Sequence, residues 1–202
     1  MVDLFNYTRR ESSVAHIGAI DLGGDNPIRI QSMTTTNTND TEACVKQAEE
    51  IIKAGGELVR FTTQGSREAE NMKNINAGIR ADGYQTPLVA DVHFNPNVAD
   101  VAALYCEKVR INPGNYVDPA RKFIKQEYTD EEYAHELQKI EDRFVPFLNI
   151  CKENHTAIRI GVNHGSLSDR IRNRYGDTPE GIVESCLEFL RICKKENFND
   201  VV

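Results

Sequence analysis

The sequence predicts an α/β fold, the N-terminal portion of a TIM (β/α)8 barrel with about five βα units preceded by a β-hairpin. Strand-like and helix-like segments alternate along the 202 residues, and each strand has one wholly apolar face. Repeated βα units imply a parallel sheet covered by helices, either doubly wound or closed into a barrel. Because a complete barrel needs about 250 residues, five units and the start of a sixth strand form an unfinished one.

Turn-forming residues separate the expected strands. The run GGDNP at residues 23–27 lies between two alternating stretches and indicates a hairpin. Strands are then expected at residues 28–33, 58–63, 87–94 and 108–112, and over AIRIGVNHGS, residues 157–166. The last three residues, DVV, stand where a sixth strand is due, so we expect the chain to stop partway through the barrel.

The segments between the first strands have the periodicity of helices. The first helix is expected at residues 40–54, where Asn39 and Glu42 have the spacing of a capping box. A second helix is expected to begin at a Ser66 cap, and a short third helix covers about residues 97–106.

Two further helices follow a long polar connection. Thr129 and Glu132 have the capping-box spacing and open the longer of the two. Pro146 should kink or interrupt this helix, because an interior proline removes one backbone hydrogen bond. The last helix is expected to begin at Thr178-Pro179, since proline suits the first helical position.

The two faces of each strand differ in polarity. Side chains alternate across a strand, so one face holds Val59 and Phe61 in one strand and Val109 and Ile111 in another. The opposite face is polar toward the carboxyl end of the strand. In a barrel that face lines the lumen, and active sites lie at its C-terminal rim. The polar residues expected to converge there are Arg60, Asp91, His93, Arg110, Asn112, Arg159 and Asn163.

Three arginines at matching positions on three strands indicate an anion site. A lone arginine on a strand is more often at a sheet edge or in a structural ion pair, but Asp91 is the one counter-charge visible near all three. The guanidinium group binds phosphate oxygens bidentately and keeps its proton, so the expected ligand is phosphorylated. Loops after the strands add hydroxyl and backbone donors, among them His164-Gly-Ser166.

Some polar residues leave two interpretations open. Asp91 and His93 have a spacing that permits a divalent metal site, although three nearby arginines oppose a cation and the aspartate could equally orient His93 or hold a substrate hydroxyl. The basic residues Arg170, Arg172 and Arg174 either extend the anion site or lie on a solvated face. On the first strand, alternation places Gln31, Met33 and Arg29 on the lumen face; Gln31 and Met33 are expected to line the pocket, whereas Arg29, lower on that face, is expected to be structural.

Composition narrows the function classes. A formal net charge of −7 argues against a general nucleic-acid binder, which would carry a basic stripe. No run of eighteen apolar residues and no secretory leader are visible, so we expect a cytoplasmic protein with no membrane partner. The five cysteines form no CxxC pair and are expected to be reduced, mostly buried thiols.

Five motifs in this order closely resemble one family. They are GGDNPIRIQSMTTTNTND, LVRFTTQG, PLVADVHFNP, KVRINPGNY and IRIGVNHGSLSDRI. They resemble the 4-hydroxy-3-methylbut-2-enyl diphosphate synthases, iron–sulfur enzymes of the methylerythritol phosphate route to isoprenoids. The segment QEYTDEEY, together with NHGSLSDRI, looks like the long form of the family, which has an extra domain inserted after the barrel.

The resemblance implies a TIM barrel followed by a domain with a [4Fe-4S] cluster. It implies an enzyme that reductively opens 2-C-methyl-D-erythritol 2,4-cyclodiphosphate, with loss of water, using electrons from ferredoxin or flavodoxin. The residues that match the family's substrate-binding motifs are Arg60, Asp91, His93, Arg110, Asn112, Arg159, Asn163, His164 and Ser166.

One departure from the family limits what this chain should do. None of its cysteines has the family's cluster-ligand context, so residues 1–202 are expected to be the N-terminal part of the substrate-binding barrel. The remaining barrel, the insert domain and the iron–sulfur domain would then lie outside it. We expect no reductase turnover and at most weak substrate affinity from this chain alone. Its open sheet edge and exposed apolar surface are expected to cause association with a second copy or poor solubility. The alternatives are a pterin-binding-like transferase barrel and a non-catalytic anion-binding module.

Overall fold

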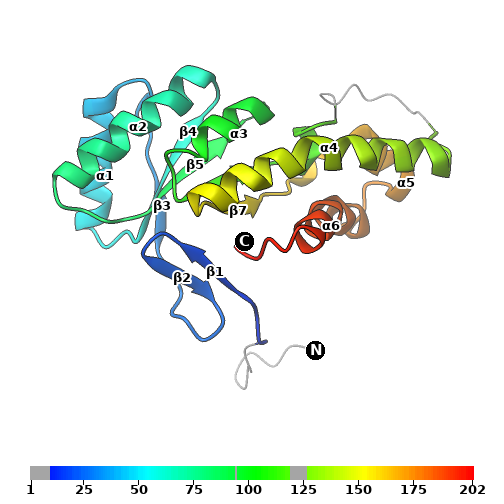
Figure 1. Cartoon of the computed structure of the whole chain (residues 1–202), viewed down its shortest axis with the longest axis horizontal. Coiled ribbons are helices and arrows are strands. Elements are labelled where there is room, and N and C mark those ends of the chain that lie inside the picture. The colour runs from blue at the N-terminus through cyan, green and yellow to red at the C-terminus, as the bar shows by residue number, and fades with distance from the viewer. Residues whose placement is uncertain (1–9, 94, 119–126) are drawn as a thin grey trace.

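A computed structural model describes residues 10–93, 95–118 and 127–202 of the chain (Figure 1). The strands are β1 (Val14–Ile17), β2 (Ile20–Gly23), β3 (Gln31–Met33), β4 (Leu58–Thr63), β5 (Leu88–Val92), β6 (Lys108–Ile111) and β7 (Ala157–Ile160). The helices are α1 (Thr41–Lys53), α2 (Ser66–Ala81), α3 (Pro96–Ala102), α4 (Asp130–Asn154), α5 (Asp169–Tyr175) and α6 (Pro179–Lys195). Two short 3-10 turns, η1 (Pro113–Asn115) and η2 (His164–Ser166), follow β6 and β7.

The sheet has the strand order of a barrel. Strands β3 to β7 pair side by side in chain order, each parallel to the next. A doubly wound sheet would reverse this order at a switch point, and β3 to β7 show no reversal. Val201 forms a parallel bridge with Ile158, so the expected sixth strand begins beside β7. The structure therefore confirms an α/β fold consistent with part of a TIM barrel.

The apolar strand faces build the main core beneath the helices. Val59, Phe61, Val109 and Ile111 are buried there with side chains from the helices, including Phe144 of α4. Burying large apolar side chains between sheet and helices supplies the main favourable free energy of this architecture. The expected division of each strand into two faces is confirmed for β4 and β6.

The antiparallel β1–β2 hairpin closes the amino end of the sheet (Figure 1). Its turn is at Gly18 and Ala19, so the hairpin turn expected at GGDNP, residues 23–27, is wrong; that run leads from β2 to β3, and these two strands do not pair. Ile17 at the end of β1 is fully buried against Leu58, Val89 and Ala157, which lie on the lumen side of three strands. The hairpin therefore seals the lower lumen with apolar side chains, and the carboxyl ends of the strands are left for polar groups.

Four strands are shorter than expected, and of these β6 differs by one residue, since it ends at Ile111. β3 begins at Gln31, and Ile28 and Ile30 before it are exposed. β7 ends at Ile160, which is in register with Ile111 at the end of β6. In the rest of AIRIGVNHGS, residues 161–163 are irregular and residues 164–166 form η2. β5 ends at Val92. Phe94, the tail 1–9 and residues 119–126 of the polar connection lie outside the described residues.

Helix starts follow capping chemistry that the spacing only partly predicted. Asp40 caps α1, because its carboxylate accepts from the backbone of Ala43 at 3.0 Å; the expected Asn39 cap is wrong. Gly65, not Ser66, is the N-cap of α2. The capping box of Thr129 with Glu132 on α4 is confirmed.

Two further predictions about the helices differ from the structure. α3 ends at Ala102, shorter than the expected 97–106. Pro146 does not interrupt α4, which continues unbroken to Asn154 because Phe144, Phe147 and Leu148 around it are fully buried. The Thr178 cap and the first-position Pro179 of α6 are confirmed.

Candidate functional site

Three arginines from three strands form one layer on the lumen side of the sheet. Arg110 of β6 is in register with Arg159 of β7 on one side and with Asp91 of β5 on the other. Asp91 is in turn in register with Thr62, and Arg60 lies one inward-facing position earlier on the same strand, β4. Strand alternation therefore places all three guanidinium groups on one side of the sheet, as the sequence predicted.

Asp91 fixes two of these arginines and the neighbouring histidine. Its side chain is only 3% exposed. One carboxylate oxygen accepts a hydrogen bond from Arg60 and lies 3.1 Å from Nε2 of His93. The other accepts from Arg110 at 3.3 Å. The carboxylate thus orients three side chains, and its charge is used within the protein.

The layer retains donors that nothing in the described chain satisfies. Nε of Arg60 is buried without a hydrogen-bond partner. Among residues 10–93, 95–118 and 127–202, Arg159 makes no ion pair and no side-chain hydrogen bond. A buried donor without an acceptor costs free energy, so a ligand with several oxygens would stabilise this layer.

Arg110 adds a third charge held in a fixed position. Its Nη2 donates to the carbonyl oxygen of Gly161 at 2.7 Å. Burial lowers the pKa of Arg110; Asp91 opposes this shift, and the positive charges of Arg60 and Arg159 add to it. A guanidinium group still keeps its proton at neutral pH. The layer therefore has three positive charges against one carboxylate.

The loops after β6 and β7 are joined to each other. Asn112 donates from its side-chain amide to Oγ of Ser166 at 2.7 Å, and that hydroxyl donates to the carbonyl of Asn163 at 3.2 Å. The backbones also meet closely: a Cβ added at Gly114 would lie 1.8 Å from the carbonyl oxygen of Ser166. Asn112, Asn163 and Ser166 therefore form one group.

His164 is the predicted site residue that joins neither group. Its Nε2 lies 2.5 Å from Oδ1 of Asp177, and the other carboxylate oxygen of Asp177 accepts from Arg172 at 2.6 Å. More than half of the His164 side chain is exposed. Loop geometry turns it toward the start of α6, which its place in the motif did not reveal.

The basic residues of α5 have different environments. Arg170 is buried, and its guanidinium group forms ion pairs with Asp118 at 3.0 Å and Glu188 at 2.7 Å. It neither extends the anion site nor faces solvent, so both earlier interpretations are wrong for it. Arg172 and Arg174 lie at the surface in ion pairs, as a solvated face predicts.

Lys108 of β6 also belongs to the lumen side, although it was not among the predicted site residues. Alternation places it on the same face as Arg110, and its Nζ donates to Oε1 of Gln31 at 3.1 Å. Lys108 is 3% exposed. The same two-residue spacing that picked out Arg110 could have found it. Arg29 has the expected structural role, in an ion pair with Glu57 at 2.8 Å.

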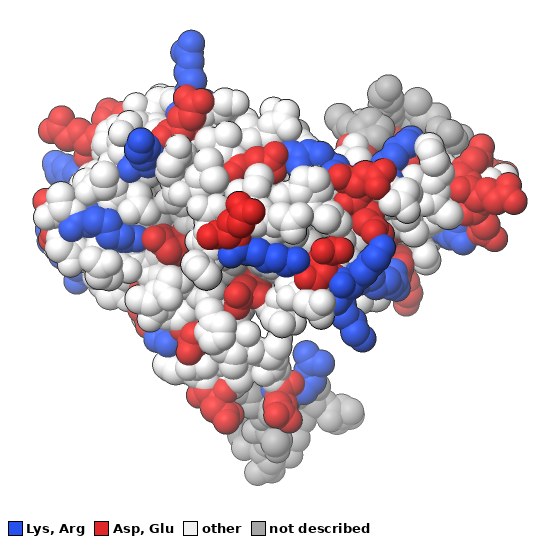
Figure 2. All heavy atoms as spheres, in the orientation of Figure 1, with Lys and Arg blue, Asp and Glu red and all other residues white. Residues whose placement is uncertain are grey.

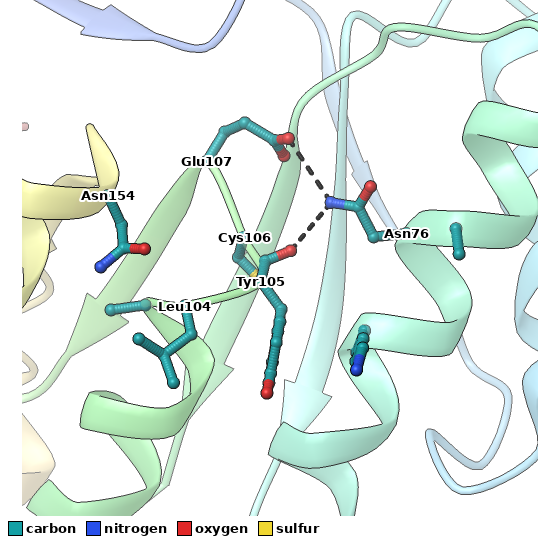
Figure 3. Close-up of a pocket in the computed structure, with 9 residues that line it drawn as sticks. Asn76, Leu104, Tyr105, Cys106, Glu107 and Asn154 are labelled. Carbon is teal, nitrogen blue, oxygen red and sulfur yellow. Dashed lines mark hydrogen bonds between the residues drawn. The ribbon is translucent and has the colours of Figure 1, made fainter.

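A pocket of about 340 Å³ lies at the other end of the sheet (Figure 3). Its labelled residues include Asn76, Cys106 and Glu107, and Glu107 immediately precedes β6. Glu107 accepts from Arg80 at 2.7 Å and from the backbone of Leu88 at 2.7 Å, so its charge stabilises the fold. None of the predicted site residues lines this pocket.

The cysteines do not suit a metal cluster. Four of the five are buried and the fifth is half-buried, and burial raises the pKa of each thiol. The part of the chain that the structure describes contains no group of three His, Cys, Asp or Glu side chains able to hold a metal ion. The thiols here therefore do not fit a [4Fe-4S] cluster.

Two further features concern nucleic acid and membranes as partners: the distribution of surface charge and the apolar character of the helices. Acidic and basic side chains are interspersed over the face seen in Figure 2, which shows no continuous basic stripe. Of the helices in the described ranges, none combines the length and apolar character that crossing a membrane requires.

Comparisons with known proteins identify the relatives. Residues 12–202 match the GcpE TIM-barrel domain. A Phocaeicola vulgatus protein is 78% identical over 100% of this chain and 33% of its own length, and an Akkermansia muciniphila protein is 50% identical over 98% and 34%. Both are named 4-hydroxy-3-methylbut-2-en-1-yl diphosphate synthase (flavodoxin). The chain thus spans about a third of the length of these curated relatives.

Solved structures resemble the chain only distantly. β-Methylaspartase from Clostridium tetanomorphum gives a TM-score of 0.47 at 12% identity, over 84% of this chain and 43% of that one. Dihydropteroate synthase from Xanthomonas albilineans gives 0.42 at 14% identity, over 91% and 74%. Neither likeness is close enough to favour the pterin-binding alternative. The match over residues 12–202 shows that the chain belongs to the GcpE TIM-barrel domain family.

Proposed function

We propose that this chain supplies the diphosphate-binding part of a flavodoxin-dependent 4-hydroxy-3-methylbut-2-en-1-yl diphosphate synthase. The observation that carries the proposal is the arginine layer, in which Arg159 and Nε of Arg60 have no acceptor in the described chain. Relatives at 76–78% identity have this enzyme name. The substrate would be 2-C-methyl-D-erythritol 2,4-cyclodiphosphate, a compact anion with many oxygens.

Each group in the site has a role in this proposal. Arg159 and Arg60 bind phosphate oxygens through their unsatisfied donors, and Arg110 adds charge from a fixed position. Asp91 keeps Arg60, Arg110 and His93 in place. Asn112, Asn163 and Ser166 hold the two adjoining loops at the rim of the layer, where their amide and hydroxyl groups reach the substrate.

The proposal gives this chain a binding role and no redox step. The iron–sulfur cluster that the family implies does not fit the cysteines present here, so the electrons would enter through a different segment. Residues 1–202 would be the N-terminal part of the barrel, with the remaining barrel, the insert domain and the cluster domain elsewhere in the full-length enzyme. Flavodoxin would be the electron donor and the cytoplasm the site of action. Association through the exposed edge near Ile28 and Ile30 stays a prediction.

Replacing Arg159 with methionine is expected to weaken diphosphate binding at least about tenfold, because a charge-assisted contact is worth about 1.5–3 kcal/mol. The measurement is calorimetric titration of the purified protein with the cyclic diphosphate and with inorganic pyrophosphate. Arg191→Met is the matched control, since Arg191 is an exposed arginine of α6 paired with Glu184. Equal affinities for Arg159→Met and wild type would contradict the proposal.

Gly161→Ala is expected to weaken the same binding about tenfold by displacing Arg110. The added Cβ would lie 2.1 Å from Nε of Arg110, so the side chain must leave its contacts with Gly161 and Asp91. Gly165→Ala is the control, because the nearest atom to its Cβ lies 3.5 Å away. Urea unfolding of each variant confirms that it is folded. Wild-type affinity in folded Gly161→Ala protein would show that the position of Arg110 does not matter.

A further inference from the structure

Lys108 is a buried amine without a counter-charge. It lies on the lumen side of β6, one inward-facing position before Arg110. Its hydrogen-bond partner is the uncharged side-chain amide of Gln31, and Nζ must reach from β6 to β3, three places along the sheet. Within the described ranges no carboxylate forms an ion pair with it. A buried ammonium normally has such a partner, because desolvation is costly.

The groups around Lys108 come from every strand of the sheet. From β3 it meets Gln31, from β4 Arg60, and from β7 Arg159, whose charges repel it. The residues in register on β5 and β7 are Val89 and Ala157, which belong to the apolar cluster closed by the hairpin. On β5 the nearest acid toward the rim is Asp91, and its oxygens are already paired with Arg60, Arg110 and His93. The amine therefore lies between an apolar floor and a positive layer.

We infer that Lys108 is a fourth cation of the anion site, a positioning residue that takes up a proton when a diphosphate binds in the layer above it. This inference rests on the proposed function and deepens it. A diphosphate in the arginine layer would cancel the repulsion from Arg60 and Arg159 and supply the negative charge that Lys108 lacks. The proton comes from solvent and adds to the lone pair of Nζ, and no other bond forms or breaks.

The electrostatics of the unliganded site agree with this geometry. Burial lowers the pKa of Lys108 to about 8, and the charges of Arg159 and Arg60 contribute to the shift. At pH 8 about half of the molecules would then lack this proton, and the bound anion would restore it. Because binding and protonation are linked, affinity for the anion should fall as pH rises above 8.

The test compares pyrophosphate binding by wild type, Lys108→Met and Lys108→Arg from pH 6.5 to 9.5. Calorimetry at pH 8 in two buffers of different ionisation enthalpy gives the number of protons taken up. Lys108→Met removes the charge, whereas Lys108→Arg keeps it at every pH tested. The titration of pyrophosphate itself is common to all three proteins, so differences between their profiles report on residue 108.

The expected result has three parts. Wild type takes up more protons than either variant at pH 8, Lys108→Met binds about tenfold more weakly at pH 7, and the affinity of wild type falls more steeply above pH 8 than that of Lys108→Arg. If wild type binds pyrophosphate but all three proteins take up equal numbers of protons, this inference is wrong and the proposed function stands. If wild type does not bind pyrophosphate, both are wrong. The comparison needs only one variant that folds, because either Lys108→Met or Lys108→Arg gives the proton count of a protein without the titrating amine.

Discussion

Replacing Arg170 with methionine is expected to lower the free energy of unfolding by about 3–5 kcal/mol. Its guanidinium group is 2% exposed and forms two-point contacts with both Asp118 and Glu188, at 2.7–3.2 Å. Tyr133 donates a further hydrogen bond to Glu188 at 2.5 Å. Without the arginine, two buried carboxylates would have no cation beside them. An uncompensated buried charge has a high desolvation cost, so removing one partner of such a cluster lowers the free energy of unfolding strongly.

The position of this cluster gives the same variant a second effect. Asp118 follows the η1 loop, Arg170 follows η2, and Glu188 belongs to α6. The ion pairs thus join the two loops that hold Asn112 and Ser166 to one helix. Where Arg170→Met still folds, those loops should be less ordered, so pyrophosphate affinity should fall along with stability.

Urea unfolding of Arg170→Met measures the first effect, and Arg174→Met is the matched control on the same helix. Arg174 pairs at the surface with the exposed Asp130, so its loss should change stability little. A triple variant, Arg170→Met with Asp118→Asn and Glu188→Gln, removes the stranded charges and should recover part of the loss. If Arg170→Met is as stable as the control, the cluster does not stabilise the fold.

The layer of three arginines could be predicted from the sequence because strand alternation is local information. Arg60, Arg110 and Arg159 each sit among apolar neighbours with period two. Parallel strands in chain order place Arg110 beside Arg159 and Arg60 on the same side of the sheet, two strands away from Arg110. The polar rim was predicted in the same way from residues that directly follow β6 and β7.

The environments of Arg170, His164 and Lys108 could not be predicted, because contacts between distant parts of the chain determine them. Arg170 is followed by two more arginines in a polar segment, and only Asp118, 52 residues earlier, and Glu188 show that it is buried. His164 lies in a motif beside Asn163 and Ser166, but its environment is set by Asp177 after α5. Lys108 has the pattern of a strand-end lysine that would extend to solvent. The hairpin that encloses it from below lies more than eighty residues earlier in the chain.

Replacing Lys108 with methionine is expected to raise the free energy of unfolding at pH 7 by about 2 kcal/mol. The pKa of Lys108 is about 8 in the folded protein and near its ordinary value, 10.5, in the unfolded chain. Between these values the unfolded chain binds more protons, so wild-type stability rises with pH. The cost of the buried charge is therefore fully present below pH 8 and disappears as pH approaches 10.5. Methionine has a similar length and no charge, although it loses the bond to Gln31.

Thermal unfolding of both proteins from pH 7 to pH 10 tests this sign. The advantage of Lys108→Met should be largest at pH 7 and should shrink toward pH 10, whereas Lys152→Met, a lysine at the protein surface, should show no such trend. A wild type more stable than Lys108→Met at pH 7 would mean that the amine is well compensated without a ligand. A variant that gains stability while losing pyrophosphate affinity is the result expected of a charge kept for binding rather than for folding. A purely structural lysine would lose both together, so the two measurements distinguish the roles.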